Sequence, residues 1–182
     1  MGYNVLNVGA VVLAACKSEQ LLLPFLGKTT IVSILEALET AGISVQIVVL
    51  GGNFEPVVDA IRPKLGKTRI ALNLAPEQDT ISSFQAGLVV IQNLDAAFLV
   101  SGDQPIFDPN LLTTMVKTLE QNTEALIVSP IYNEDKGRPL LFRRELFAEI
   151  LSLTGNQTIH EIVNNHLDRL VTVEAKEWTN KE

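Results

Sequence analysis

Short runs of hydrophobic residues alternate with segments of helical periodicity along the whole chain. The first run, Val8–Ala15, contains no polar side chain, which is typical of a strand buried on both faces of a parallel sheet. The next segment, Thr29–Ala41, places its large hydrophobic residues on one side at helical spacing, and Gly42 is a suitable helix stop. Asp108 and Pro109 are typical of a helix start, with aspartate as the N-cap and proline in the first turn.

The same patterns continue through the rest of the chain. They predict further strands at residues 45–50, 69–72, 96–100, 126–129, 139–142 and 170–173, and further helices at residues 54–64, 81–93, 144–153 and 158–165. Alternation of strands and helices favours a largely parallel sheet with helices on both faces, so we expect an α/β fold. No internal repeat or linker divides the sequence, so we expect a single domain over residues 1–182.

The composition is that of a globular protein with an acidic balance. Of the 182 residues, 47% are hydrophobic and 19% are charged, and the net charge is −7. No stretch gathers the lysines and arginines that would neutralise a phosphate backbone, so we expect no nucleic-acid partner. Cys16 is the single cysteine, which excludes a disulfide framework within the chain. No hydrophobic run is long enough to cross a bilayer, so we expect a cytoplasmic protein without membrane contact.

Three loops that follow predicted strands are candidates for a site, because ligands bind beyond the carboxyl ends of parallel strands. They cover residues 14–28, 101–105 and 155–160. A more specific pattern lies in Leu13–Cys16, Leu21–Phe25 followed by Gly27 and Lys28, Asn73 with Ser82–Leu88, Gly102–Pro105 and Gly137–Phe142. In this order the segments resemble the MobA-like NTP transferases, closest to the branch that attaches cytidylate to molybdopterin.

This resemblance covers about residues 8–174. It implies a three-layer α/β/α sandwich around a mostly parallel, Rossmann-like sheet with one antiparallel strand, as in the nucleotide-diphospho-sugar transferases. It also implies a reaction in which a phosphate of the acceptor attacks the α-phosphate of a nucleoside triphosphate and pyrophosphate leaves. Such a reaction requires backbone N–H groups, basic side chains and Mg²⁺, because negative charge must be neutralised at the phosphates.

The resemblance further implies partners and site residues. The partners are CTP, favoured over GTP, and molybdopterin, with a molybdoenzyme as a further candidate and Mg²⁺ as the cofactor of an active enzyme. The residues expected to contact the nucleotide are Ala14, Ala15, Cys16, Lys17, Ser18, Lys28, Ser83 and Gly102. Asp103 and Asn156 are expected to bind the metal. No single residue is assigned a catalytic role.

The loop at residues 16–20 departs from the family pattern. Cys16 replaces a glycine that lets backbone amides approach the phosphates closely. Only Lys17–Gln20 separate Cys16 from the Leu-Leu-Leu-Pro-Phe segment, so the family's Arg-Met-Gly element is missing. Gln20 stands where the phosphate-binding lysine belongs, and Glu19 adds a negative charge. We therefore expect poor binding of a triphosphate.

Other motif positions also depart from the family pattern in ways that weaken the binding of phosphate or metal. Asp79 and Thr158 replace glycines, Gln85 and His160 replace arginines, and Asn156 replaces a metal-binding aspartate. A hydrogen bond to a charged group contributes about 1.5–3 kcal/mol, so losing the arginine, the lysine and one carboxylate would cost about 5–9 kcal/mol if the effects added. Even half of that sum is about two to three decades in rate. We expect weak nucleotide transfer, or none.

Three functions remain open at this point. The first is an active nucleotidyltransferase with a rearranged loop, and the second is a non-catalytic binding or scaffolding protein for a molybdoenzyme or its cofactor. The third is a transferase that uses a sugar phosphate or 2-phospholactate as acceptor. Arg138, Arg143 and Arg144 form a basic cluster that fits either an anionic substrate or a solvated strand end. His160 fits an exposed helical position better than an anion site, and Lys28 fits either an anion contact or solvent.

Overall fold

The computed structural model describes residues 5–15, 18–52, 54–73, 80–106, 108–133, 135–154 and 157–176. Its main sheet has eight strands, with β8 lying beside β7 and the others in the order β10-β7-β9-β6-β1-β4-β5. These strands are β1 (Val8–Ala14), β4 (Val45–Leu50), β5 (Thr68–Leu72), β6 (Ala96–Ser101), β7 (Ile127–Tyr132), β8 (Asp135–Lys136), β9 (Leu140–Arg143) and β10 (Leu170–Glu174). A separate short hairpin joins β2 (Pro24–Phe25) to β3 (Lys28–Thr29).

The sheet is mostly parallel, as the alternating sequence pattern predicts. β1 pairs in parallel with β4 and β6, β4 with β5, and β7 with β10. β9 is inserted between β6 and β7 and runs antiparallel to both, which agrees with the antiparallel strand that the family resemblance implies. The two-residue β8 adds a further antiparallel pairing with β7. The carboxyl ends of β6, β7 and β10 therefore lie at one edge of the sheet, together with the start of β9.

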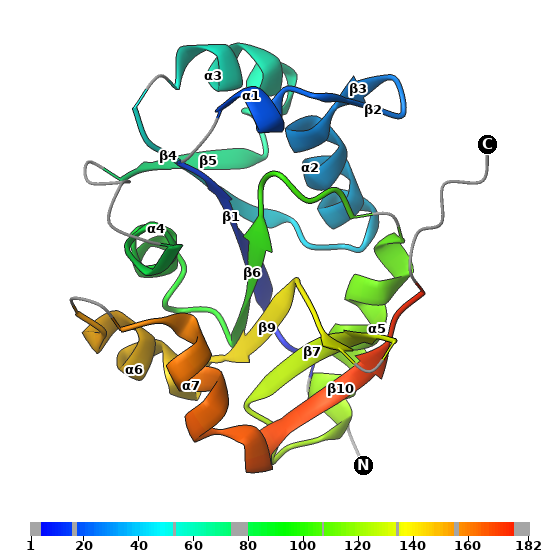
Figure 1. The fold of residues 1–182 in the computed structure, drawn as a ribbon, viewed down its shortest axis with the longest axis vertical. Helices are drawn as coiled ribbons and strands as arrows, with labels where there is room; N and C mark the ends of the chain where they lie inside the picture. The colour runs from blue at the N-terminus through cyan, green and yellow to red at the C-terminus, as the bar shows by residue number, and fades with distance from the viewer. Residues whose placement is uncertain are drawn as a thin grey trace.

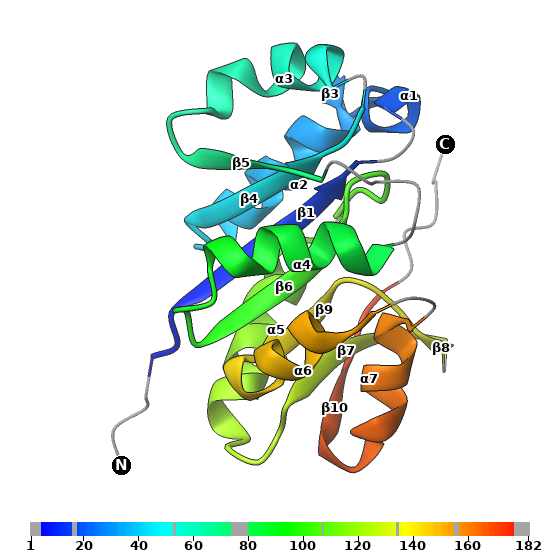
Figure 2. The same cartoon turned by 90° about the vertical axis from the view of Figure 1, so that its left-hand side faces the viewer.

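Helices cover both faces of the sheet (Figures 1 and 2). The α-helices are α1 (Ser18–Leu21), α2 (Thr30–Thr40), α3 (Glu55–Ile61), α4 (Thr80–Val90), α5 (Pro109–Gln121), α6 (Phe147–Ser152) and α7 (Ile159–Asn165). Short 3₁₀ turns are η1 (Arg62–Lys64), η2 (Arg144–Leu146) and η3 (Leu167–Arg169). One core contains side chains of α2, α3 and α5, and the other contains side chains of α4, α6 and α7. Figure 2 shows the second group lying over the near face of the sheet.

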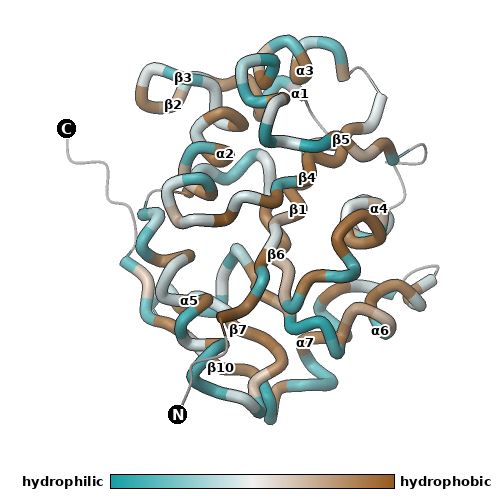
Figure 3. Tube along the Cα trace, turned by 180° about the vertical axis from the view of Figure 1, so that it is seen from behind, coloured by the Kyte–Doolittle hydropathy of each residue, from teal (hydrophilic) through white to brown (hydrophobic). Residues whose placement is uncertain are grey.

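Strand β1 shows why the central strands contain no polar side chain. Val12 belongs to the core under α2, α3 and α5, whereas its neighbour Val11 belongs to the core under α4, α6 and α7. Both side chains are fully buried, because successive residues of a strand point to opposite faces. Figure 3 shows the resulting hydrophobic colouring along β1, β4 and β6. No helix among the residues that the structure describes is long and apolar enough to cross a membrane.

Most predicted elements are confirmed, with small shifts at their ends. The carboxylate of Asp108 accepts a hydrogen bond from the backbone N–H of Asn110 at 2.9 Å, so the expected N-cap of α5 is present. Gly42 follows α2 with a φ of 82°, a backbone conformation that favours glycine. The sequence patterns miss α1, the β2–β3 hairpin and β8, because elements of two to four residues are too short to show periodicity.

Helix α4 packs unusually close to the sheet at Gly87. A Cβ atom at this position would lie 2.3 Å from Cγ1 of Val11 and 3.0 Å from Cγ2 of Val49, which project from β1 and β4. Both valines are fully buried and stiff at χ1, so they cannot turn away. Glycine is therefore needed here for a close helix–strand contact, which fixes the height of α4 above the strands.

We predict that Gly87→Ala lowers the free energy of unfolding, because the added methyl overpacks a full core at a cost of about 1–3 kcal/mol. Alanine gains about 1 kcal/mol over glycine in a helix interior, so the expected net loss is up to about 2 kcal/mol. Chemical denaturation followed by circular dichroism measures the change. Adding Val11→Ala should recover part of the loss, because it removes the atom that the new methyl meets.

Gly66→Ala is the matched control for this substitution. An added Cβ at Gly66 meets no atom within 4 Å, so we expect a change within about 0.5 kcal/mol. Equal losses in the two variants, or a more stable Gly87→Ala protein, would contradict close packing as the reason for the glycine.

Candidate functional site

The loop after β6 lies directly against the end of β1. The backbone N–H of Gly102 donates a hydrogen bond to the carbonyl of Leu13 at 2.9 Å. A Cβ atom on residue 102 would lie 2.3 Å from that same oxygen, so only glycine permits the contact. The contact holds the loop at residues 101–105 against the end of β1, where the loop at residues 14–28 begins.

Asp103 follows this contact at the edge of the sheet. Its Oδ1 accepts a hydrogen bond from the hydroxyl of Ser101 at 2.6 Å, and its side chain is exposed. Ser101 is the last residue of β6, so the strand itself fixes the hydroxyl that orients the carboxylate. The carboxylate therefore lies just beyond the carboxyl end of β6, where the resemblance implies a metal.

A cavity of about 820 Å³ lies beside Asp103, and we call it the β6–β10 pocket. Its walls come from β6 and the loop after it, the start of α5, the end of β7, the segment before β9 and the end of β10. Its charged lining residues are Asp103, Asp108, Glu174, Arg138 and Lys176. Much of the remaining lining is apolar, and both signs of charge are present.

Arg138 is held in this pocket by the backbone around it. The ring of Tyr132 packs against Gly137, where a Cβ atom would lie 2.5 Å from Cε2 of the ring. The Tyr132 hydroxyl donates a hydrogen bond to the Arg138 carbonyl at 3.3 Å, and the peptide bond between Arg138 and Pro139 is cis. Burial lowers the pKa of Arg138, while the nearby negative charge of Asp103 raises it. Burial also raises the pKa of Tyr132.

The structure separates the three arginines that the sequence places together. Arg143 donates hydrogen bonds to the carbonyls of Ala125 and Leu119, at 2.8 and 2.6 Å, and so completes the end of α5. Arg144 forms an ion pair with Asp95 at 3.3 Å. These two residues therefore have structural partners, and Arg138 alone of the three lines the β6–β10 pocket.

The second family motif contributes buried hydrogen bonds at the start of α4. The side-chain amide of Asn73 donates to the hydroxyls of Ser83 and Ser82, at 2.9 and 3.0 Å. Ser83, expected to contact the nucleotide, is 4% exposed. Gln85, which stands where the family often has arginine, donates to the carbonyl of Ile150 at 2.8 Å and so ties α4 to α6.

An apolar side chain of α1 packs beside the end of β1. β1 ends at Ala14, and α1 begins at Ser18, so very little chain connects the strand to the helix. Leu21, in this single-turn helix, is 1% exposed. Its Cδ2 lies 2.8 Å from the point where residue 102 would carry a Cβ atom, so it packs on the loop after β6.

Among the residues that the sequence singles out, Cys16, Lys17, Asp79 and Asn156 lie outside the described residues. Ala14 and Ala15, also expected at the nucleotide, are buried at the end of β1. His160 is exposed on α7, as its sequence position predicts, whereas His166 contacts Glu149 at 2.8 Å between Nε2 and Oε2.

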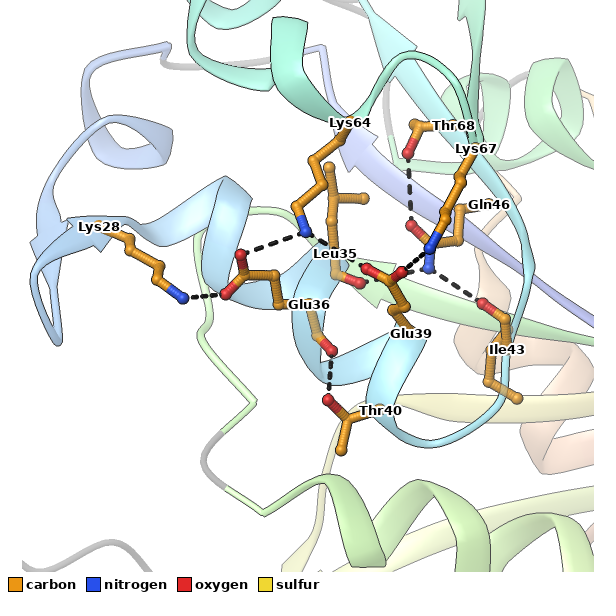
Figure 4. A network of polar contacts seen from close by, with 10 residues as sticks. All are labelled: Lys28, Leu35, Glu36, Glu39, Thr40, Ile43, Gln46, Lys64, Lys67 and Thr68. Carbon is orange, nitrogen blue, oxygen red and sulfur yellow. Dashed lines mark hydrogen bonds and ion pairs between the residues drawn. The ribbon is translucent and has the colours of Figure 1, made fainter.

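Lys28, in β3, takes part in a chain of alternating charges that runs over α2, η1 and the turn after η1 (Figure 4). Its ammonium group pairs with Glu36, and Lys64 bridges Glu36 and Glu39 at 3.2 Å each. Lys67 pairs with Glu39 at the end of this chain. The β2–β3 hairpin therefore holds the Lys28 side chain against α2, and its charge is balanced by a carboxylate there.

The donor set around Asp103 fits a metal ion that arrives with a substrate. Among the residues described, no group of three or more histidine, cysteine, aspartate or glutamate side chains could enclose a metal. Mg²⁺, however, is commonly bound by one or two carboxylates together with substrate phosphates and water. Asp103 supplies one such carboxylate at the strand edge.

A model of the MobA-like NTP transferase domain matches residues 10–170, which is most of the chain. The chain belongs to this family. No curated protein matches it at the level of sequence. The mostly parallel sheet with helices on both faces is thus the nucleotidyltransferase fold that the motifs imply.

Solved structures share this fold at low sequence identity. Rv0371c from Mycobacterium tuberculosis is 22% identical with a TM-score of 0.81, and the match covers 97% of this chain and 92% of that one. The same mycobacterial protein has also been solved with manganese. A nucleotidyl transferase from Methanothermobacter thermautotrophicus is 24% identical with a TM-score of 0.78, covering 92% and 87%. A cytidylyltransferase from Leptospira borgpetersenii is 18% identical with a TM-score of 0.71, covering 97% and 79%.

We predict that Glu36→Gln destabilises the fold more at neutral pH than in acid. The hydrogen bond from Lys28, together with Lys64, lowers the pKa of Glu36 below the usual 4.5. A lowered pKa in the folded state means that the stabilisation is present above the unfolded value and is lost as pH falls through the folded value. Urea denaturation from pH 7 to pH 3 at low salt should show the difference from wild type shrinking in acid.

Asp59→Asn is the control, because the pair of Asp59 with Arg62 is highly exposed and should contribute little. If the free energies of unfolding of Glu36→Gln and wild type differed by the same amount from pH 7 down to pH 3, that result would contradict the ion pairs of Glu36 as the cause of the difference.

Proposed function

We propose that this member of the MobA-like NTP transferase family binds nucleoside triphosphates weakly and transfers nucleotides slowly or not at all. The observation that carries the proposal is the position of Leu21. Its buried side chain packs on Gly102, beside the strand ends where a phosphate-binding loop would direct its backbone N–H groups. A hydrocarbon side chain offers no hydrogen bond to a polyanion.

The distribution of basic side chains supports the same proposal. A triphosphate needs several cations, because each unbalanced charge raises the cost of bringing it to the protein. Lys28, the basic residue that the family motif would supply, is paired with Glu36. Glu19 lies in the first turn of α1 and adds a negative charge to the same region. Asn156, the second proposed metal ligand, would bring no charge to the metal.

Asp103 and Ser101 are the part of the site that still suits the family's chemistry. If Mg²⁺ is bound, it supplies positive charge that offsets the negative charge on the phosphate oxygens. Asp103 would hold it, and Ser101 would orient the carboxylate through their hydrogen bond. The resemblance makes CTP the first nucleotide to test and molybdopterin the first acceptor, followed by sugar phosphates and 2-phospholactate.

A second candidate function is binding without catalysis, for a molybdoenzyme or its cofactor. It is favoured by one observation: the β6–β10 pocket is open at about 820 Å³, although Leu21 fills the space beside Gly102. A protein that had lost nucleotide binding could still use this pocket.

We predict turnover at least about two decades below that of an active cytidylyltransferase assayed in parallel. The assay follows pyrophosphate release and radiolabelled product from CTP or GTP, with Mg²⁺ or Mn²⁺ and each acceptor in turn. Asp103→Asn serves as the variant that removes the carboxylate of the proposed metal ligand. Robust turnover that requires the metal and disappears in Asp103→Asn would overturn the proposal.

We also predict that 5 mM CTP or GTP with Mg²⁺ raises the melting temperature by less than about 1 °C. A ligand at one hundred times its dissociation constant would stabilise the fold by about 2.7 kcal/mol, which corresponds to a shift of several degrees. Differential scanning fluorimetry measures the shift, with ADP-ribose as a diphosphate control. A large shift that depended on Mg²⁺ would show that the triphosphate site is intact.

A further inference from the structure

Strand β5 ends the main sheet without a strand on its outer side. It pairs in parallel with β4, and in the described part of the chain no further strand lies beyond it (Figure 2). The backbone N–H of Asn73, just after β5, donates to the carbonyl of Leu50 in β4. Successive residues of a strand direct their backbone groups to opposite sides, so Arg69 and Ala71 also bond toward β4. The residues whose backbone groups point away from the sheet are therefore Thr68, Ile70 and Leu72.

This outer edge lacks the usual protection against pairing with another strand. Unpaired N–H and C=O groups along an edge invite such pairing, and proteins often block it with lysine or proline. β5 contains neither, and its one charged side chain, Arg69, lies on the face opposite to Ile70 and Leu72. Ile70 is 39% exposed and Leu72 is 54% exposed. The edge therefore combines free backbone groups with exposed apolar side chains.

The edge is complementary to a second copy of itself. If two copies of β5 run antiparallel about a two-fold axis at Ile70, Ile70 lies opposite its counterpart and Thr68 lies opposite Leu72 of the second copy. All three outward-facing residues then form hydrogen-bonded pairs, and their apolar side chains join on one face. An axis at Arg69 or Ala71 would use only two of these residues. An axis at Arg69 would also place two arginines opposite each other, which is unfavourable.

Helix α3 adds charge complementarity to this arrangement. A helix that connects two parallel neighbouring strands runs antiparallel to them, as α3 does between β4 and β5. A two-fold axis that makes the β5 strands antiparallel therefore makes the two α3 helices antiparallel on one face of the joined sheet. The exposed Glu55 lies in the first turn of α3, and the exposed Arg62 follows its last residue. The acidic start of each helix thus lies toward the basic end of the other.

We propose that the protein forms a symmetric dimer in which the β5 edges of two copies pair antiparallel about Ile70, so that one sheet continues through both. An interface built on two short strands buries less than the roughly 1,200 Å² of stable complexes, so we expect a dissociation constant on the order of 100 μM. The inference goes beyond the proposed function, because no nucleotide takes part. Since the two sheets run in opposite directions, the dimer leaves both β6–β10 pockets open.

Sedimentation velocity from about 10 μM to about 1 mM tests the proposal, and we expect the dimer to form within this range. Ile70→Lys should weaken dimerisation at least about tenfold, because it removes the central apolar pair and places like charges opposite each other. Thr172→Lys is the matched control, since it puts the same charge at an exposed position of the other edge strand, β10. It should dimerise within about twofold of wild type.

Two results would overturn the proposal. One is a chain that stays monomeric over the whole range, which would leave the edge to a strand of another protein. The other is a dimer that Ile70→Lys does not weaken. If Ile70→Lys fails to fold, Ile70→Pro replaces it, because proline removes an N–H that points away from β4 and is tolerated on edge strands.

The charges of α3 provide a test that leaves β5 unaltered. Glu55→Lys alone and Arg62→Glu alone should each weaken the dimer about threefold or more, because each places like charges together across the two-fold axis. An equimolar mixture of the two variants should recover an affinity close to that of wild type, since each new charge then meets its opposite. A mixture that dimerises no better than the separate variants would overturn the antiparallel arrangement.

A disulfide tests the register. Cys16 is the only native cysteine, so Cys16→Ser provides a background without thiols. Residues of a hydrogen-bonded antiparallel pair are about 5.5 Å apart between Cα atoms, which a disulfide can span. In this background Ile70→Cys should give a covalent dimer on mild oxidation. Leu72→Cys is more exposed but lies opposite Thr68, so it should cross-link far less. Equal cross-linking of the two variants would overturn the register.

Discussion

The hydrogen bond from the Gly102 backbone to the Leu13 carbonyl is the contact on which the arrangement of the site depends. It brings the loop after β6 onto the end of β1, at a distance that excludes a Cβ atom. The neighbouring residues are positioned by this contact. Leu21 packs beside Gly102, and Ser101 and Asp103 line the β6–β10 pocket. Because parallel strands end together at one edge, a single backbone contact can join Leu13 and Gly102, which are 89 residues apart in sequence.

Charge is distributed differently on the two sides of that contact. On the side of α1, Lys28 is neutralised by Glu36 within a chain of surface ion pairs. On the side of the pocket, Arg138 lines the cavity together with Asp103. A polyanion binds where cations converge, so the proposed weak binding of a triphosphate beside α1 rests on the pairing of Lys28 with Glu36.

The fold could be predicted from the sequence, but the roles of individual cations could not. The sequence of Val8–Ala15 predicts a central strand, because burial on both faces requires an uninterrupted apolar run. Arg138 and Arg143 are close in sequence, yet Arg138 precedes β9 and Arg143 is its last residue, so the strand places them at opposite ends. The pairing of Lys28 with Glu36 depends on a hairpin of two-residue strands, which leaves no periodic signal in the sequence. Gly102 was identifiable as a motif residue, but the close approach to Leu13 becomes apparent only in three dimensions.

The burial of Leu21 beside Gly102 has a thermodynamic consequence. Burying a leucine side chain stabilises a fold by about 1.5–3 kcal/mol, and Leu21 is 1% exposed where it packs on the loop after β6. A ligand that entered between α1 and Gly102 would have to displace this side chain and would lose that stabilisation. This cost would add to the cost of separating Lys28 from Glu36, so the proposed weak binding of a triphosphate follows from packing as well as from charge.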